Sequence, residues 1–371
     1  MERPTAIFLI HLIQDVQVLR PLIFMAAHDF GLKARLLVSD RFRGRDVSGI
    51  WSKELEDIST QSGADLIFFS DEWEGRRQLN GHGVIFSASE SNIRNHSTAH
   101  DIFRVAPSQF LRVTVQHGFE CVGLRHGVGH KRAYGQTASF AADVICTWYG
   151  IDHLASLSSS QAPKVLVCGP TSLLQSPVGD PPAGERSGLV CENLHSVRFE
   201  STDKLEAEFL KTFRKFAGAM NRQGRKVRLR PHPGGRHSAK SQGLLPKNVE
   251  IEDSPMYRLD LRQFAYGVSP PSSVLIDMLL ANIPTAVWRD WRGRIDLTNY
   301  EGLTVVSSSD ELIRFVQAAE QSRDRIVLDQ RRWLDRQGIP LEPTNVHERY
   351  SELFEAALRM NSGPPSVLRV G

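Results

Sequence analysis

The most distinctive chemistry in this sequence is an arginine and a histidine at the end of a short apolar strand. The run Lys-Val-Arg-Leu-Arg-Pro-His-Pro-Gly-Gly spans residues 226–235, and its apolar alternation predicts a buried strand over 227–229. Arg230 and His232 follow that strand directly, and prolines on both sides of His232 prevent a helix from beginning there. Because open α/β sheets bind ligands at the carboxyl ends of their strands, this segment is suited to holding an anionic group.

A second segment adds the start of a helix. The run Ser-Pro-Pro-Ser-Ser-Val-Leu-Ile-Asp-Met-Leu-Leu over residues 269–280 predicts a strand end, a turn and then a helix. Ser272 or Ser273 is suited to capping that helix, and the other N–H groups of its first turn could bind an anion. We predict that Arg230, His232 and this helix start bind one phosphate. Capping alone is the plainer role for the serines, and the two roles are compatible.

Polar side chains also follow a predicted strand in the N-terminal half. The run Val-Gln-His-Gly-Phe-Glu contains Gln116, His117, Gly118 and Glu120, and the glycine permits a sharp turn. A histidine and a glutamate within one turn can act as acid and base, or can hold the hydroxyl of an acceptor. The alternative is a solvated loop in which His117 bonds a neighbouring carbonyl.

The second half of the chain offers another carboxylate at a strand end. Glu192 and Asn193 follow the predicted strand 188–191, and we expect Glu192 to lie across a cleft from Glu120. Two facing carboxylates can serve as nucleophile and as acid or base in substitution at a sugar carbon. The structural alternative pairs Glu192 with a nearby arginine such as Arg198, since structural ion pairs are common.

Three further segments stay open between functional and structural roles. Residues 71–75 are acidic and suit either a cleft or a solvated helix start. Residues 125–132 form a basic, glycine-containing loop, suited either to gripping an acidic acceptor or to a mobile lid, and Arg125 is our candidate there for acceptor binding together with Gln116. Residues 288–294, Trp-Arg-Asp-Trp-Arg-Gly-Arg, suit stacking on a base, contact with lipid headgroups or anchoring of a surface loop.

These residues need a scaffold of alternating strands and helices, and the apolar periodicity supplies one. Strands are predicted at 6–12, 34–39, 64–70, 83–87, 112–116, 143–147 and 164–168, and then at 188–191, 227–229, 248–252, 264–268, 285–288 and 303–306. Helices are predicted at 16–28, 51–61, 203–222, 274–281, 310–321, 323–336 and 346–360. Strands that are apolar throughout and alternate with helices are typical of parallel sheets covered on both faces.

A Pro- and Gly-rich stretch divides the chain. Residues 176–188 lack apolar periodicity and predict a linker between two doubly wound, Rossmann-like α/β domains that face each other across a cleft. The predicted units are an acceptor-binding domain over 1–178 and a nucleotide-donor-binding domain over 186–345. A C-terminal helix over 346–361, which could return to the first domain, and a flexible tail over 362–371 complete the division.

Composition excludes several classes of function. The 371 residues suit two domains, and 45 basic against 42 acidic residues leave no general footprint for nucleic acid. Four cysteines without CxxC spacing, no HExxH spacing and no GxxxxGK[ST] run leave zinc sites, disulfide frameworks and P-loop chemistry unsupported. We therefore expect no metal and a reducing cytoplasmic location. No apolar run reaches the ~20 residues that span a bilayer, and peripheral attachment at the inner face of an inner membrane stays open.

Taken in order, the motifs resemble bacterial surface-polysaccharide transferases of the GT-B fold. Gln-His-Gly in the first half, Arg-x-His-Pro in the second and Ser-Ser-Val-x-x-Asp after it carry the resemblance. Two branches are similar: the retaining β-Kdo transferases, which use CMP-Kdo in lipopolysaccharide and capsule assembly, and the CDP-glycerol glycerophosphotransferases. In both, the His of His-Pro and the serines hold the phosphate of a cytidine nucleotide, which implies that role for His232, Ser272 and Ser273, with Arg230 beside them.

Two departures from the glycerophosphotransferase pattern favour the Kdo branch. Cys-Glu-Asn-Leu-His stands where a Pro-Thr-Trp-Arg-like strand end is usual, and Gln-His-Gly-Phe-Glu stands in place of Trp-His-Gly-Thr. Both departures introduce a carboxylate. The resemblance then implies a metal-independent, CMP-Kdo-dependent glycosyltransferase without a cofactor, in which Glu192 attacks the anomeric carbon and Glu120 is acid and base, with His117 beside it. An aspartate is the usual nucleophile of that branch. The rival from another class is a non-catalytic nucleotide- or glycan-binding module of a larger synthase.

Overall fold

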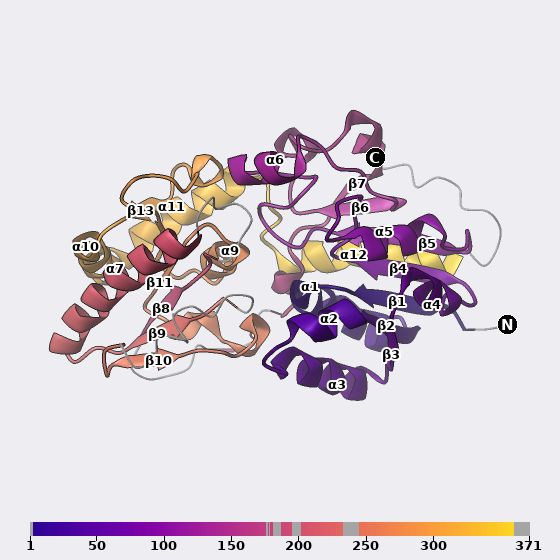
Figure 1. Ribbon diagram of the computed structural model, residues 1–371, viewed down its shortest axis with the longest axis horizontal. Coiled ribbons are helices and arrows are strands. Elements are labelled where there is room, and N and C mark those ends of the chain that lie inside the picture. The colour runs from indigo at the N-terminus through magenta and orange to yellow at the C-terminus, as the bar shows by residue number, and fades with distance from the viewer. Residues whose placement is uncertain are drawn as a thin grey trace.

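Two parallel β-sheets organise the chain (Figure 1). The computed structural model describes residues 3–175, 177, 179–180, 187–194, 202–232 and 245–359. Within them, the first sheet has the order β3-β2-β1-β4-β5-β6-β7, and all its neighbouring strands are parallel. Its strands are β1 (Thr5–Ile10), β2 (Lys33–Ser39), β3 (Asp65–Phe69), β4 (Gly83–Ser87), β5 (Phe110–Val115), β6 (Val144–Thr147) and β7 (Val165–Val167).

The second sheet repeats this plan in the C-terminal half. Its order is β10-β9-β8-β11-β12-β13, again with parallel neighbours throughout. The strands are β8 (Gly188–Cys191), β9 (Val227–Arg230), β10 (Val249–Ile251), β11 (Tyr266–Ser269), β12 (Thr285–Trp288) and β13 (Thr304–Val306). The strand order reverses beside β1 in one sheet and beside β8 in the other, so each domain has a topological switch point, the position at which open α/β sheets generally bind ligands. The predicted doubly wound α/β architecture is therefore confirmed.

Helices connect the strands and cover the sheets. In the first domain they are α1 (Ile13–Phe24), α2 (Asp40–Arg45), α3 (Ile50–Ser62), α4 (Glu72–Arg77), α5 (Ser97–Arg104) and α6 (Val128–Tyr134). Later in the chain they are α7 (Thr202–Arg222), α9 (Ser273–Leu280), α10 (Ser309–Gln321), α11 (Arg323–Arg336) and α12 (Pro343–Arg359). Within the described parts of the chain, none of these helices combines the length and apolar character that crossing a bilayer requires.

The interior of each sheet is buried as predicted, but its edges are not. All six residues of the central strand β1 are buried. The edge strands differ, since the side chains of Phe68 on β3 and Val305 on β13 are about two-fifths exposed, at 43% and 42%. The prediction of apolar strands covered on both faces was wrong at these edges. An edge strand has a neighbour on one side only, and the covering layer of helices ends beside it.

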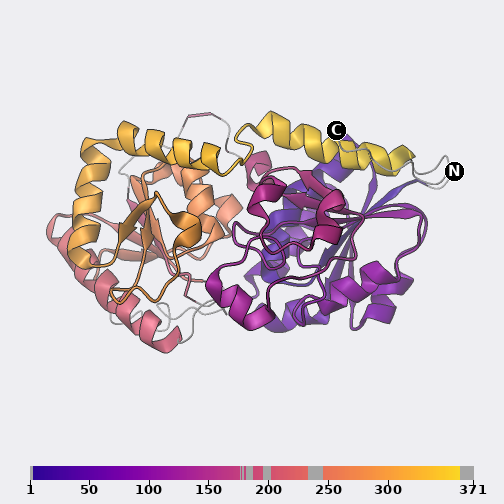
Figure 2. The same cartoon turned by 90° about the horizontal axis from the view of Figure 1, so that it is seen from above.

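The last helix belongs spatially to the first domain. After α11 the chain leaves the second sheet, and α12 lies along the first domain in both views (Figure 1, Figure 2). Tyr350 and Phe354 are fully buried there. The ring of Phe354 lies 5.0 Å from that of Phe30 and 5.2 Å from that of Phe86, which is on β4. The polypeptide thus passes between the domains twice, and the 362–371 tail lies outside the described residues.

A carboxylate of α3 joins the domains on one side. Glu54 accepts a hydrogen bond from the Tyr257 hydroxyl at 2.8 Å, and Arg258 contacts both of its oxygens. Glu54 itself is buried, and Tyr257 and Arg258 come from the second half of the chain. A buried carboxylate that accepts hydrogen bonds from two side chains of the other domain helps to fix the relative position of the two domains.

Candidate functional site

The end of β9 places Arg230 inside the second domain. Arg230 pairs with Cys191 of β8 in the parallel register, and its carbonyl accepts the backbone N–H of Glu192 at 2.8 Å. Its guanidinium is buried, donates to the carbonyl of Ser254, and has its pKa lowered by that burial. His232 follows and is half-buried. A buried cation beside a strand end attracts an incoming anion more strongly than an exposed cation would, because the protein interior screens charge less than water does.

The predicted helix start is confirmed and adjoins that strand end. Ser272 is the N-cap residue of α9, and its hydroxyl accepts the N–H of Val274 at 3.3 Å. The side chain of Asn193, at the end of β8, donates to the carbonyl of Pro271 at 2.8 Å. β8 lies between β9 and β11 in this parallel sheet, so Arg230 and the serines lie along the same edge of the sheet, at strand ends two strands apart.

The aspartate of the Ser-Ser-Val-x-x-Asp run lies behind this edge. Asp277 on α9 is buried, and burial raises the pKa of its carboxyl to about 6, although the charge of Arg230 acts in the opposite direction. Asp277 also lines a cavity of about 150 Å³ between the domains, together with Gln17, Ser172 and Tyr257. The carboxylate of Asp277 is thus close enough to the guanidinium of Arg230 for their opposite charges to attract each other.

The first domain contributes its Gln-His-Gly loop to the same edge. A Cβ atom added to Gly118 would lie 2.6 Å from the hydroxyl oxygen of Ser273, closer than any normal contact. The backbone beside His117 is therefore packed against the start of α9. Sequence reasoning placed both motifs at strand ends, and the structure brings them together across the domain boundary.

Replacing Gly118 by alanine is expected to destabilise the protein by about 1–3 kcal/mol, because the new methyl group overlaps the Ser273 hydroxyl. Urea unfolding measures the change. Gly150→Ala is the matched control, since a methyl group there has open space around it. Adding Ser273→Ala to Gly118→Ala should restore most of the loss, and a purely additive double variant would contradict the contact.

His117 lies among polar groups at the end of β5. Its Nδ1 atom is 2.6 Å from the carbonyl oxygen of Ala88 and 3.6 Å from the sulfur of Cys121. Burial disfavours the protonated ring, but Cys121, the carboxyl of Asp15 and the Ala88 carbonyl outweigh it and raise the pKa of His117 to about 9. The raised pKa favours the protonated form of the ring, which is better suited to binding an anion than to accepting a proton.

A buried polar cluster extends from His117 to the switch point of the first sheet. Asp15, fully buried, accepts the backbone N–H groups of His11 and Leu12 at 2.8 Å and 2.7 Å, and also the Ser89 hydroxyl. The sequence analysis did not single out His11 or Asp15. The position of His11 directly after β1, with Asp15 in the first turn of α1, was the signal that could have identified them.

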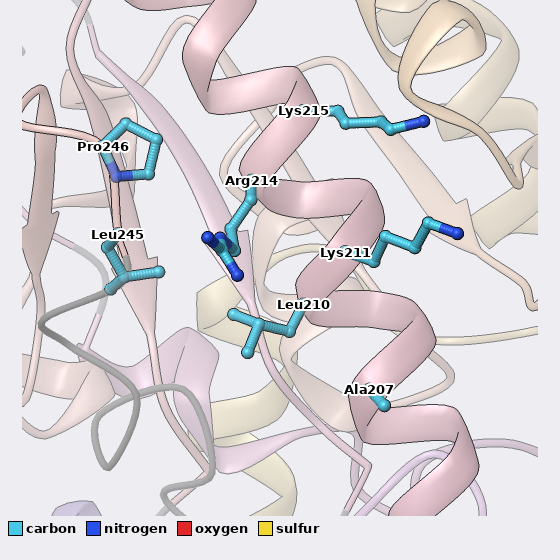
Figure 3. Close-up of a pocket in the computed structure, with 7 residues that line it drawn as sticks. All are labelled: Ala207, Leu210, Lys211, Arg214, Lys215, Leu245 and Pro246. Carbon is cyan, nitrogen blue, oxygen red and sulfur yellow. The ribbon is translucent and has the colours of Figure 1, made fainter.

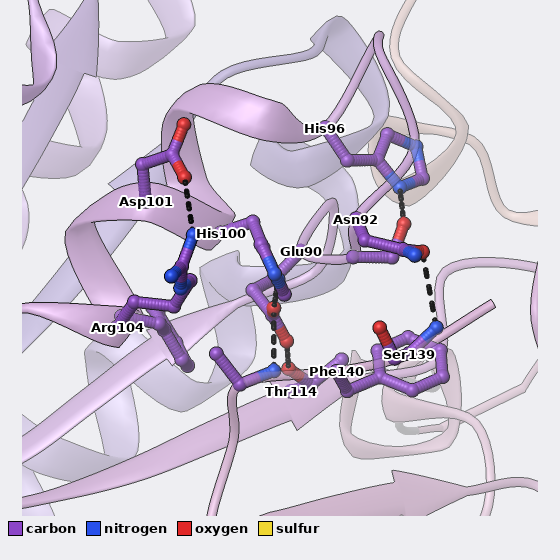
Figure 4. Close-up of polar contacts among 12 residues, drawn as sticks. Glu90, Asn92, His96, His100, Asp101, Arg104, Thr114, Ser139 and Phe140 are labelled. Atoms are coloured by element: carbon purple, nitrogen blue, oxygen red, sulfur yellow. Dashed lines mark hydrogen bonds and ion pairs between the residues drawn. The ribbon is translucent and has the colours of Figure 1, made fainter.

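The buried carboxylate of Glu90 lies next to this cluster and has a structural role (Figure 4). Glu90 is buried and accepts hydrogen bonds from the hydroxyl of Thr114 at 2.6 Å and from the N–H of Ala141 at 2.9 Å, and it contacts the ring of His100. The ring of His96 lies nearby, 2.8 Å from the Ser91 hydroxyl. Glu90 therefore fastens the end of β4 to β5 and to the 139–141 loop.

Buried neutral histidines predict a loss of stability as pH falls below 6.5. Burial, with Arg45 and Arg41, lowers the pKa of His11 to about 4, and burial, with His117, lowers the pKa of His96 to about 3. The unfolded chain, with ordinary pKa values of 6.5, takes up protons first, so stability is lost from pH 6.5 down to about 4 for His11 and down to about 3 for His96. Urea unfolding across this range measures the loss, which is at most about 1.4 kcal/mol per unit of pKa difference.

A matched pair of variants tests the assignment to buried histidines. His96→Gln should flatten the dependence of unfolding free energy on pH, because glutamine does not titrate. His347→Gln, at an exposed position on α12, should leave the slope unchanged. An unchanged slope in His96→Gln would contradict the assignment.

Glu120 and Arg125 lie at a contact between the domains. The Glu120 carboxylate accepts the side-chain N–H of Asn299 at 2.7 Å. Arg125 donates to Asn299 at 3.0 Å and to Gln337 at 2.8 Å, and its guanidinium stacks 4.6 Å from the ring centre of Phe119. Both side chains thus bridge the domains in this structure, and their acid–base and acceptor-binding roles stay predictions.

Gln116 and the basic segment after it are more ordered than a loop. Gln116 is buried, with its amide bonded to Gly118, Tyr149 and Trp148, so any effect on an acceptor would act through the position of its neighbours. Within residues 125–132, predicted as a loop, α6 begins at Val128. That prediction was wrong because the glycine spacing concealed a short helix.

Glu192 lies at the carboxyl end of β8, as predicted, and is only 2% exposed. Its proposed structural partner Arg198 is outside the described residues, so the choice between nucleophile and ion pair stays a prediction. Among the described residues, no group of three or more His, Cys, Asp or Glu side chains is arranged to hold a metal ion.

Comparison with known proteins finds likeness in three dimensions only. No family model and no curated protein matches the sequence. UDP-GlcNAc 2-epimerase from Neisseria meningitidis, bound to UDP-GlcNAc, matches with a TM-score of 0.58 at 10% identity, over 95% of this chain and 99% of that one. The wall teichoic acid polymerase TagF, with CDPG, gives 0.60 at 9% identity, over 98% and 91%.

A third match is CalG4, the calicheamicin glycosyltransferase, with a TM-score of 0.54 at 12% identity over 96% of this chain and 99% of that one. Identities this low establish the fold and leave the activity to the residues themselves. The chain therefore has the GT-B fold: two Rossmann-like domains, each built on a parallel sheet, with the strand ends of the second domain next to the Gln-His-Gly loop of the first.

Proposed function

We propose that this protein is a glycosyltransferase that moves Kdo, or a related ulosonic acid, from its CMP-activated form to a glycan acceptor. The observation that carries the proposal is the meeting of Arg230, the Ser272 helix start and the His117 loop at one sheet edge, with His232 beside them. A buried guanidinium and a helix N-terminus form a site suited to a single phosphate. The solved GT-B structures support the fold on which this proposal is built.

The proposed reaction proceeds in two balanced steps. In the first, a carboxylate oxygen of Glu192 attacks the anomeric carbon, and the bond between that carbon and the phosphate oxygen breaks, releasing CMP. Arg230, His232 and the start of α9 stabilise the negative charge that grows on the leaving phosphate. In the second, the acceptor hydroxyl attacks the same carbon, Glu120 takes its proton, and Glu192 leaves as a carboxylate. Two inversions give net retention, and side chains replace a metal in neutralising the phosphate.

A second candidate, transfer of glycerol phosphate from CDP-glycerol, is favoured by one observation. Burial covers Glu192 and a domain contact occupies Glu120, whereas His117, with its pKa raised to about 9, is positively charged next to the Ser273 end of α9. Cationic groups from both domains suit a donor with two phosphates. The likeness to TagF is compatible with this candidate at the level of fold.

Ligand-induced thermal stabilisation of the full chain separates the candidates. CMP, CDP-glycerol and UDP-GlcNAc are compared at equal concentration, since a ligand at a hundred times its Kd stabilises by about 2.7 kcal/mol. The main proposal predicts stabilisation by CMP and release of CMP from CMP-Kdo that increases with acceptor. Preference for CDP-glycerol supports the second candidate, and preference for UDP-GlcNAc contradicts both. CMP binding without any turnover supports a non-catalytic module instead.

The partners and location follow from the same proposal. The partners are a nucleotide sugar and a glycan or glycolipid, with no nucleic acid. A cytoplasmic location is supported by the four free, buried cysteines, a usage typical of reducing compartments.

A further inference from the structure

The outward face of α7 is basic along most of its length. Lys211, Arg214, Lys215 and Arg222 are all exposed and recur at helical spacings of three, four and seven residues; Lys211, Lys215 and Arg222 share one side of the helix, and Arg214 lies on its flank. They cover roughly 16 Å, at about 1.5 Å per residue. None of the four has an ion-pair partner among the described residues. Their charge is therefore available to an external partner.

An exposed tryptophan is attached to the same helix. The backbone N–H of Trp291 donates to the Glu208 carboxylate at 2.7 Å, and Arg294 donates to its other oxygen at 2.9 Å. Glu208 is one turn before Lys211, so its negative charge is neutralised where the basic face begins. Trp291 is 67% exposed, and the guanidinium of Arg292 lies 4.8 Å from the centre of its ring. The loop therefore adds an aromatic side chain and another cation beside the helix.

A hollow lies between α7 and residues 245–246, beside these basic side chains (Figure 3). Its volume is about 590 Å³, and it is lined by Lys211, Arg214 and Lys215 and, at its apolar wall, by Leu210, Leu245 and Pro246. In Figure 3, Arg214 points toward Leu245 and Pro246, while Lys211 and Lys215 project away on the other side. The surface thus combines cations, a tryptophan and a shallow apolar recess.

We propose that this surface, the basic face formed by Lys211, Arg214, Lys215, Arg222, Trp291 and Arg292, binds the headgroup layer of an anionic phospholipid bilayer. Tryptophan concentrates at the interface between headgroups and hydrocarbon, where its ring is apolar and its N–H is hydrated. Exposed lysines and arginines close to it are attracted by the negative surface of such a bilayer. The chain as a whole is nearly balanced, with 45 basic and 42 acidic residues. The positive charge of this face is therefore a local feature and not part of a general excess of positive charge. The inference does not depend on the proposed transferase activity.

Flotation of the full chain with vesicles tests the proposal. Binding is expected to vesicles of phosphatidylcholine with roughly a third phosphatidylglycerol, to be weak with phosphatidylcholine alone, and to fall as salt rises. The triple variant combines Lys211→Glu, Arg214→Glu and Lys215→Glu. Each basic residue near such a surface raises the affinity for the vesicles about fivefold, so this variant should bind at least about a hundredfold more weakly. A control of equal net charge changes three exposed arginines of α11 and α12, namely Arg325→Glu, Arg332→Glu and Arg349→Glu, and should bind like the unaltered protein.

A fluorescence measurement shows directly whether Trp291 enters the bilayer interface, which a binding affinity does not show. Anionic vesicles should shift the emission of the protein to shorter wavelength, and Trp291→Phe should abolish that shift. Trp73→Phe is the matched control, because Trp73 is 65% exposed but lies beside Asp71, Glu72 and Glu74. Equal loss of binding in both charge-reversal variants, equal binding to neutral vesicles, or stronger binding to single-stranded DNA than to vesicles would each overturn the proposal.

Discussion

Changing Glu192 to glutamine is expected to lower the release of CMP from CMP-Kdo by about a thousandfold or more, while CMP affinity changes by less than about twofold. Glutamine has almost the shape of glutamate but cannot attack an anomeric carbon. The effect should therefore appear in turnover, and donor binding should be preserved because Arg230 and the start of α9 are unaltered. Single-turnover CMP release and calorimetric CMP binding measure the two quantities separately.

Two further variants distinguish chemistry from loss of structure. Glu120→Gln should lower turnover by about 10²–10⁴-fold, the usual contribution of a general acid or base. Glu54→Gln removes a different buried carboxylate, bonded to Tyr257 and Arg258, and should change stability much more than CMP release per folded molecule. If Glu192→Gln turns over normally, Glu192 is a structural carboxylate and the two-step mechanism is wrong.

Changing Arg230 to methionine is expected to lower kcat/KM for the donor by about 10²–10³-fold. The guanidinium is buried at the strand end, and its removal takes away the main positive charge offered to the phosphate. It also leaves the buried Asp277 without the nearby cation that opposes the rise in its pKa. Urea unfolding should therefore show a loss of stability as well, which separates this variant from one that affects binding alone.

Arg228→Met is the matched control for that variant. Arg228 lies two residues earlier on β9, on the same face of the sheet, and forms a part-buried ion pair with Glu252 at 3.0 Å. It should affect kcat/KM by less than about threefold, since the charge of Arg228 is already neutralised by Glu252. Arg230→Lys keeps the charge but loses the planar fork, so an intermediate loss is expected. Equal activity of Arg230→Met and the unaltered protein would remove Arg230 from the donor site.

Most of the scaffold could be predicted because buried parallel strands leave a strong signal. The strands at 83–87, 188–191 and 285–288 have the predicted bounds, and each is a short apolar run ending in a turn. The helices at α2, α5 and α6 were not predicted. They are six to eight residues long, which is too short for an apolar face to repeat and be recognised.

The site could be predicted only where residues follow a strand in the same segment. Arg230 and Ser272 were predicted in this way, and both lie at the carboxyl edge of the second sheet, while their role in binding stays a prediction. The contacts of Arg125 with Asn299 and Gln337 join positions about 170 and 210 apart in the chain, which no local pattern encodes. The burial of Asp15 likewise depends on β4 packing beside β1. Such contacts are products of the assembled domains and leave no spacing in the sequence.

The attachment of α12 to the first domain has a consequence for how the molecule can be divided. A protease that cleaved between residues 175 and 187 would leave Tyr350 and Phe354, which complete the hydrophobic core beside β4, covalently joined to the other fragment. The two fragments should therefore elute together from a size-exclusion column until denaturant is added. The N-terminal fragment expressed alone should lack the core contacts that Tyr350 and Phe354 provide.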